Sequence, residues 1–216
     1  MPRASDLKTA TPLTIFGGTF DPIHLGHLHA ISSIKTQVEL GELLVVPAGR
    51  PWQKSDRDLA SGPHRLEMCR LAFANEPDVN VSDIEILRDG PTFTIDTVDE
   101  LKSRFTDPDH RRQINMIIGA DSVKSLHLWH RYEDLIKSVH IIVCARPEYP
   151  MFADQLPTSG FTLVEVSALP VSSSMVRERL SRRENVADLL PKAVWKYIIE
   201  NNLYGQGQAA PGDRQP

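Results

Sequence analysis

The sequence predicts an α/β protein built on a doubly wound parallel sheet, with helices on both faces and a small helical extension near the C-terminus. Short apolar runs alternate with helical patterns for most of the chain, which is typical of repeated β-α-β units. The first apolar run ends in a double glycine, so a tight turn connects it to the helical stretch that follows. With 216 residues, the chain is long enough for one such domain with a substantial core.

The first half of the chain alternates strand and helix patterns after a polar arm, residues 1–11, which we expect to be flexible. LTIFGG at 13–18 predicts a buried strand that runs into a glycine turn. Pro47 and Gly49 end the second strand, and Pro63 suits the first turn of a helix. The elements predicted here are a strand at 13–18, a helix at 25–38, a strand at 42–49, a helix at 63–74, extended chain at 79–86 and a helix at 94–105.

The second half continues the alternation and ends in helices. This pattern predicts a Rossmann-like sheet with right-handed crossovers, in which ligands bind at the carboxyl ends of the strands. We expect a single domain at 12–204, with its C-terminal helical part at about 172–204, and a disordered polar tail at 205–216. The remaining predicted elements are a strand at 114–119, short helices at 121–126 and 132–138, strands at 140–146 and 161–166, and helices at 172–181 and 191–201.

Composition excludes several classes of function. Apolar residues make up 41% and the net charge is −4, as in an ordinary globular protein, whereas a broad nucleic-acid-binding surface usually needs a basic excess. No apolar run approaches the roughly 20 residues that span a membrane, and the N-terminus lacks the apolar segment of a signal peptide. We therefore expect a cytoplasmic protein with no nucleic-acid partner and no membrane association. Cys69 and Cys144 lie in apolar stretches and are expected to be buried, reduced thiols.

A first motif, GGTFDPIHLGH at 17–27, joins the first predicted strand to the first helix. Its glycines let the backbone approach a ligand closely, and the N-terminus of the helix offers free N–H groups to an anion. His24 and His27 are one helical turn apart and can face the same side. Either feature alone is common, since an HxxH pair can be two unrelated polar residues or a metal pair. The combination predicts a phosphate site.

A second motif, VSSSMVRERL, places three serines at the start of a predicted helix. Serine is a good N-cap residue, so simple capping is one interpretation. Three hydroxyls, a helix N-terminus and Arg177 one turn later also suit a polyphosphate, because the guanidinium offers several N–H donors. Both interpretations stay open at this point.

The first motif closely resembles the signature of the nucleotidyltransferases with the HxGH motif, which include nicotinate-nucleotide, pantetheine-phosphate and glycerol-3-phosphate transferases. The resemblance implies that His24 and His27 contact ATP phosphates and stabilise the charge that develops there. SSSMVR resembles the segment of this superfamily that binds the β- and γ-phosphates. The catalytic residues implied are His24, His27 and Arg177, and Gly17, Gly18, Phe20, Ser173 and Ser174 join them in the ATP site.

Further segments resemble the nicotinate-nucleotide adenylyltransferases in particular. They are PAGRPWQK, HRLEMCRLA, IEILRDGPTFTIDTV, IIGADSVKSLHLWHR, IIVCARP and the C-terminal LLPKAVWKYIIENNLY. The first of them departs from the family, because Trp52 and Gln53 stand where proline and histidine are usual. Lys54 is retained and is implied to bind phosphate.

The resemblance also implies which residues bind each of the two substrates. It implies that Trp129 stacks on the cationic pyridinium ring of nicotinate mononucleotide, and that backbone N–H groups around Thr94 and His130 bind its carboxylate. Taken alone, Trp129 is more often a core residue, and Asp121 could merely cap a helix. The complete mononucleotide set implied is Thr19, Lys54, Thr94, Trp129, His130 and Arg146, and Gly119, Asp121 and Ser122 are implied to contact the ribose or base of ATP.

The reaction implied is transfer of AMP from ATP to nicotinate mononucleotide, giving deamido-NAD and pyrophosphate. The 5′-phosphate is already largely ionised at neutral pH, so it can attack the α-phosphorus in line without a covalent enzyme intermediate. Mg²⁺ is expected to arrive with ATP, and no residue is assigned as a metal ligand. The alternatives are a nicotinamide-mononucleotide adenylyltransferase or an inactive nucleotide-sensing module. The sequence does not indicate whether the protein is a monomer or a homo-oligomer.

Overall fold

The chain folds around one parallel sheet whose strand order is β3-β2-β1-β4-β5-β6. In the computed structural model, the residues described are 11–50, 59–104, 112–145, 156, 159–167 and 169–205. Every pair of neighbouring strands runs parallel, which confirms the predicted sheet type. The strands are β1 (Leu13–Gly18), β2 (Glu42–Pro47), β3 (Val79–Val81), β4 (Ile114–Gly119), β5 (His140–Ala145) and β6 (Phe161–Glu165).

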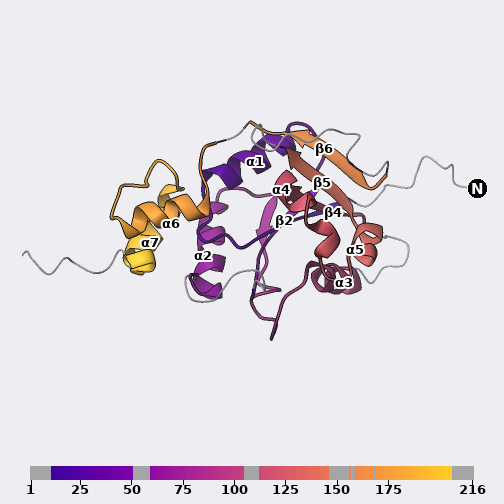
Figure 1. Cartoon of the computed structure of the whole chain (residues 1–216), viewed down its shortest axis with the longest axis horizontal. Helices are drawn as coiled ribbons and strands as arrows, with labels where there is room; N and C mark the ends of the chain where they lie inside the picture. Colours follow the sequence, from indigo (N-terminus) through magenta and orange to yellow (C-terminus); the bar gives the residue numbers. More distant parts are fainter. Residues whose placement is uncertain are drawn as a thin grey trace, which may run out of the picture.

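Helices cover both faces of this sheet, and two of them form a C-terminal extension. Figure 1 shows α6 and α7 together at one end of the molecule, near α2, and α3 and α5 at the opposite end. The α-helices are α1 (Leu25–Lys35), α2 (Gly62–Ala72), α3 (Thr94–Arg104), α4 (Ala120–Val123), α5 (Tyr132–Ser138), α6 (Ser173–Ser181) and α7 (Lys192–Glu200), and η2 (Leu126–Leu128) and η4 (Leu203–Gly205) are short 3₁₀ turns.

The core has two layers because neighbouring residues of each strand point to opposite faces. On β4, Ile117 belongs to the layer that contains buried residues of α1, α2, α6 and α7. Met116 and Ile118 belong to the other layer, with buried residues of α3 and α5. The strand therefore carries a nearly continuous apolar run, as expected where both faces of a parallel sheet are covered.

Several element boundaries differ from the predicted ones, and three of these differences have a clear local cause or consequence. The first helix ends at Lys35, where the Thr36 hydroxyl donates to the Ser33 carbonyl, and β2 ends at Pro47. Extended chain was expected through residue 86, but β3 ends at Val81 and residues 84–86 form a turn. The hydroxyl of Ser82 accepts the N–H of Ile84 there, so a local side-chain contact replaces sheet pairing.

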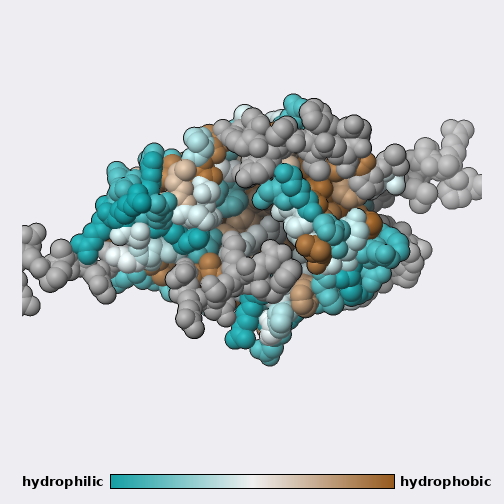
Figure 2. Space-filling view, viewed as in Figure 1, coloured by the Kyte–Doolittle hydropathy of each residue, from teal (hydrophilic) through white to brown (hydrophobic). Residues whose placement is uncertain are grey.

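The surface is polar where the helices meet solvent. Figure 2 shows hydrophilic side chains over the end formed by α6 and α7 and over the end formed by α3 and α5. The apolar sides of α6 and α7 face inward, since Val176, Leu180, Val194 and Ile198 are buried. Within the described ranges, no helix has the length and apolar content needed to cross a membrane.

Cys69 provides a test of this packing. Burial raises the pKa of its thiol well above the ordinary value, and the thiolate is the reactive species. We expect Cys69 to stay unmodified by a thiol reagent at pH 8 in the native chain and to react once urea unfolds it. Peptide mass spectrometry of both samples measures this. Rapid labelling of Cys69 in the native sample would contradict the buried position.

Candidate functional site

A cavity of about 380 Å³ lies where the order of the strands reverses. Gly17 and Gly18 at the end of β1 line it, as does Ile118 near the end of β4. These two strands are neighbours, and the chain leaves them toward opposite faces of the sheet, which opens a crevice at their carboxyl ends. The cavity therefore lies at the position where open α/β sheets bind ligands.

Residues from both expected substrate sites line the cavity. The glycine turn, the Asp121 segment, the first turn of α3 at Thr94 and the Trp129 segment all contribute to its lining. Lys54 and Arg146 lie outside the described residues. The expected site residues that line the cavity are Gly17, Gly18, Thr19, Thr94, Asp121, Ser122, Trp129 and His130.

The glycine turn leaves its backbone open to a ligand. A Cβ atom added at Gly17 would meet no atom within 4 Å, so the backbone here is reachable from the cavity. At Gly18, a Cβ atom would come within 2.9 Å of the Phe20 ring, which is buried under the turn. Phe20 adopts a left-handed backbone with a φ of 49°, an uncommon conformation for a residue with a side chain. A Cβ atom at Gly119, the N-cap of α4, would contact the Asp121 carboxylate.

His24 and His27 form a stacked pair at the start of α1. Their ring centroids are 3.7 Å apart, and the backbone N–H of His24 donates to Nδ1 of His27 at 3.2 Å. Because Nδ1 accepts this bond, Nε2 carries the proton of the neutral His27 ring and is left as a donor. The Phe20 ring meets the His27 ring edge-on at 5.1 Å. The pair is thus held in place beside the positive end of the α1 dipole.

The second motif begins α6, and its three serines have different partners. Ser172 is the N-cap of α6, and its hydroxyl accepts the N–H of Met175, so the capping interpretation is correct for this serine. Ser173 instead donates to the Pro22 carbonyl at 2.9 Å, and the Ser174 hydroxyl accepts from Arg177 at 3.3 Å.

The N-termini of α1 and α6 lie close together as a result. Arg177 Nη1 donates to the backbone oxygen of Asp21 at 2.6 Å, within the loop that precedes His24. Gly26 has so little room that a Cβ atom there would come within 2.8 Å of Val171. Two helix N-termini, two imidazoles and a guanidinium therefore converge beside the cavity, which suits a polyphosphate.

A buried carboxylate, that of Asp21, connects these segments. The residue is 1% exposed, and its Oδ1 accepts both the N–H of Ala60 at 3.0 Å and the hydroxyl of Tyr204 at 2.6 Å. Its Oδ2 lies 3.7 Å from Arg177 Nη1. Burial, together with the negative Asp21, raises the pKa of Tyr204 well above its ordinary value. The phenol therefore stays a hydrogen-bond donor to the carboxylate.

Arg65 is the second buried charge here and is 2% exposed. Its guanidinium donates to three backbone carbonyls: Thr19 at 2.9 Å, Gly49 at 2.9 Å and Ala60 at 3.0 Å. Burial lowers its pKa, and the negative charge of Asp21 opposes that shift. The sequence analysis assigned no role to Asp21 or Arg65, because most of their partners are distant along the chain.

The segment after η2 lies against the start of α3. The rings of Phe93 and His130 are 4.4 Å apart, which brings His130 next to Thr94, the first residue of α3. Arg131 has a φ of 52° and donates to Asp99 and Asp134, both at 2.9 Å. The expected carboxylate-binding groups around Thr94 and His130 are therefore brought together.

Comparison with known proteins extends this picture. The family model described as cytidylyltransferase-like matches residues 15–179. A probable nicotinate-nucleotide adenylyltransferase from Nocardioides sp. is 41% identical over 191 residues, which cover 87% of this chain and 91% of the relative. The chain belongs to the nicotinate-nucleotide adenylyltransferase family.

Two further comparisons agree with membership of this adenylyltransferase family. A probable nicotinate-nucleotide adenylyltransferase from Streptomyces coelicolor is 40% identical over 188 residues, covering 87% of this chain and 98% of the relative. The structure of Plasmodium falciparum nicotinic acid mononucleotide adenylyltransferase complexed with NaAD is 22% identical, with a TM-score of 0.75 over 90% of this chain and 97% of that one. At this low identity, the second likeness supports the fold alone.

Tyr204 tests whether the buried carboxylate of this adenylyltransferase stabilises its fold. Tyr204→Phe removes one donor from a charged, buried acceptor, so we expect the free energy of unfolding to fall by about 1.5–3 kcal/mol. Tyr197→Phe is the control, because that hydroxyl contacts the His64 imidazole rather than a buried carboxylate, and its loss should cost only about 0.5–1.5 kcal/mol. Urea denaturation of both variants measures the difference. A smaller loss for Tyr204→Phe than for Tyr197→Phe would contradict the expectation.

Proposed function

We propose that this chain transfers AMP from ATP to nicotinate mononucleotide, forming deamido-NAD and pyrophosphate in NAD biosynthesis. The observation that supports this proposal most directly is that the two motifs expected to bind phosphate meet beside a cavity lined by Trp129 and Thr94. Relatives named for this reaction match about 40% of aligned positions over most of the chain, with 41% for the Nocardioides protein. The geometry and the likeness thus support the same reaction.

The ATP phosphates are assigned to the two helix N-termini. His27 Nδ1 accepts the His24 N–H, so Nε2 carries the proton of the neutral ring and is proposed as a donor to phosphate. Arg177 is oriented by its bond to the Asp21 carbonyl, which leaves further N–H donors for the β- and γ-phosphates. The remaining proposed ATP contacts are Gly17, Gly18, Phe20, His24, Gly119, Asp121, Ser122, Ser173 and Ser174.

The mononucleotide is assigned to the part of the cavity that Trp129 and Thr94 line. Trp129 offers an aromatic face to the pyridinium ring, and the first turn of α3 at Thr94 offers N–H groups to the carboxylate. An amide in place of the carboxylate would present its own N–H donors to these donors, so the acid is favoured. Thr19, His130, Lys54 and Arg146 complete the proposed set.

Catalysis in this scheme is alignment and charge stabilisation. The 5′-phosphate of the mononucleotide attacks the α-phosphorus of ATP, a new P–O bond forms, and the bond to the pyrophosphate oxygen breaks. The attacking oxygen is already ionised, so the protein supplies no nucleophile. His24, His27 and Arg177 offset the negative charge that grows on the phosphates as the leaving group departs.

Mg²⁺ is proposed to enter with ATP and to neutralise part of the phosphate charge. In the described parts of the chain, no group of three or more His, Cys, Asp or Glu side chains could hold a metal ion. An ion that arrives with ATP takes its ligands mainly from phosphate oxygens and water. We also propose a cytoplasmic location for the reaction.

An acceptor assay tests the reaction directly. With ATP and Mg²⁺, we expect rapid pyrophosphate release with nicotinate mononucleotide and much slower release with nicotinamide mononucleotide or with no acceptor. A coupled pyrophosphate assay measures all three rates. Equal or faster release with the amide would reassign the substrate, and no release with either would favour the nucleotide-sensing alternative.

Histidine variants test the catalytic assignment. His24→Ala and His27→Ala should each lower kcat by about 10²–10³, because each removes a donor that acts on developing charge. His29→Ala is the matched control on the same helix, since its ring contacts Ser167. Steady-state kinetics and thermal melts of the three variants separate catalysis from folding. Near-normal turnover by both of the first two variants would rule out the proposed roles.

A further inference from the structure

The cavity has acidic walls although the proposed mononucleotide is itself an anion. Among its described lining residues, Glu85 and Asp121 carry carboxylates, and no lysine or arginine is present. The substrate carboxylate and phosphate would be repelled by these groups. Each carboxylate therefore needs a positive charge or a hydrogen-bond donor on the ligand. Asp121 already has a proposed role toward the ATP ribose or base, whereas Glu85 has none.

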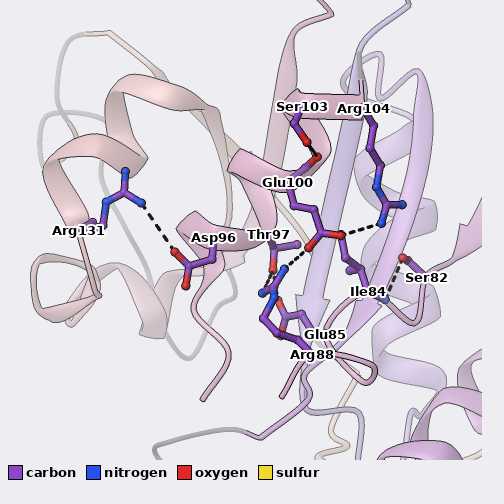
Figure 3. A network of polar contacts seen from close by, with 10 residues as sticks. All are labelled: Ser82, Ile84, Glu85, Arg88, Asp96, Thr97, Glu100, Ser103, Arg104 and Arg131. Carbon is purple, nitrogen blue, oxygen red and sulfur yellow. Dashed lines mark hydrogen bonds and ion pairs between the residues drawn. The ribbon is translucent and has the colours of Figure 1, made fainter. Parts of the chain in front are cut away.

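A series of hydrogen bonds that begins at Thr97 orients Glu85 (Figure 3). Thr97 on α3 donates its hydroxyl to Glu85 Oε1 at 2.8 Å and accepts from Arg88 Nη1 at 3.0 Å. Arg88 Nη2 donates to Glu100 at 2.6 Å, and Arg104 donates to the same carboxylate at 2.7 Å. The network fixes both the loop after β3 and the first turns of α3.

The single hydroxyl proton of Thr97 determines which groups donate and which accept in this series of hydrogen bonds. The Thr97 side chain is 1% exposed, and Arg88 can only donate, so the hydroxyl proton must point to Glu85. This bond holds the Glu85 carboxyl group in one orientation. Within the described residues, no donor is recorded on the second oxygen, Oε2. One face of a fixed carboxylate thus remains for the ligand.

The mononucleotide has one positive centre, the quaternary nitrogen of its pyridinium ring. Glu85 lines the same cavity as Trp129, the proposed stacking partner of that ring. A carboxylate and an aromatic face both attract a cation in a partly desolvated cavity. We propose that Glu85 is a specificity-determining residue that recognises the positive charge of the pyridinium ring. The proposal rests on the proposed function and deepens it.

Comparing charged and uncharged forms of one substrate tests this role. Nicotinate mononucleotide and its reduced 1,4-dihydropyridine form differ in the charge of the ring. The two forms also stack differently, but this difference is common to the wild-type enzyme and a variant, so it cancels when the two enzymes are compared. We expect Glu85→Gln to lower the ratio of kcat/KM for the oxidised over the reduced form by about tenfold, with the KM for ATP unchanged. Asp89→Asn is the matched control, an exposed acid on the same loop whose loss should leave the ratio intact.

Glu85→Asp keeps the charge and should retain most of the ratio, which covers the case in which the glutamine variant folds poorly. An equal fall for both substrate forms in Glu85→Gln would overturn the proposal, because it would indicate a structural role or a bond to a ribose hydroxyl. An unchanged ratio in a folded Glu85→Gln enzyme would overturn it as well. Turnover of nicotinate mononucleotide by the wild-type chain is a separate readout, and its absence would count against the proposed function itself.

Discussion

The buried carboxylate of Asp21 is the constraint on which the arrangement of the site depends. A carboxylate that is 1% exposed is costly unless hydrogen bonds and positive charge compensate it. The compensation comes from Ala60 before α2, from Tyr204 at the C-terminal end and from Arg177 on α6. The contacts with the Asp21 carboxylate therefore hold these three distant segments at the end of β1. The proposed phosphate donors acquire fixed positions because the carboxylate beneath them cannot be left unpaired.

Arg65 adds a second constraint of the opposite sign. Its bonds to the carbonyls of Gly49 and Ala60 hold both ends of the segment that contains Lys54, and its bond to Thr19 connects them to the glycine turn. Backbone carbonyls rather than acids satisfy this guanidinium, so its positive charge is only partly neutralised and contributes to the field around Asp21. The two buried charges thus stabilise each other while organising different loops.

Local patterns predicted most elements and eight of the eighteen described residues that line the cavity. The strand LTIFGG and the motif that follows it were recognisable because their function depends on neighbouring residues: a glycine turn, a helix N-terminus and two histidines one turn apart. Glu85 was not assigned any role, because the segment was expected to be extended and instead turns after Val81. Its partner Thr97 lies on the next helix, and no local pattern indicates that pairing. The strand order likewise depends on long-range packing.

The charge distribution explains how an acidic cavity can accept an anionic substrate. Backbone N–H groups at helix N-termini carry partial positive charge that is fixed in direction, so they can bind a planar carboxylate. Acidic side chains in the same cavity then penalise any ligand that lacks a compensating positive ring. In the proposed scheme, selectivity for an acid and selectivity for a cationic ring arise from different parts of the structure, the first turn of α3 and the Glu85 network. The two can be altered separately, because α3 contributes its backbone to one and the Thr97 side chain to the other.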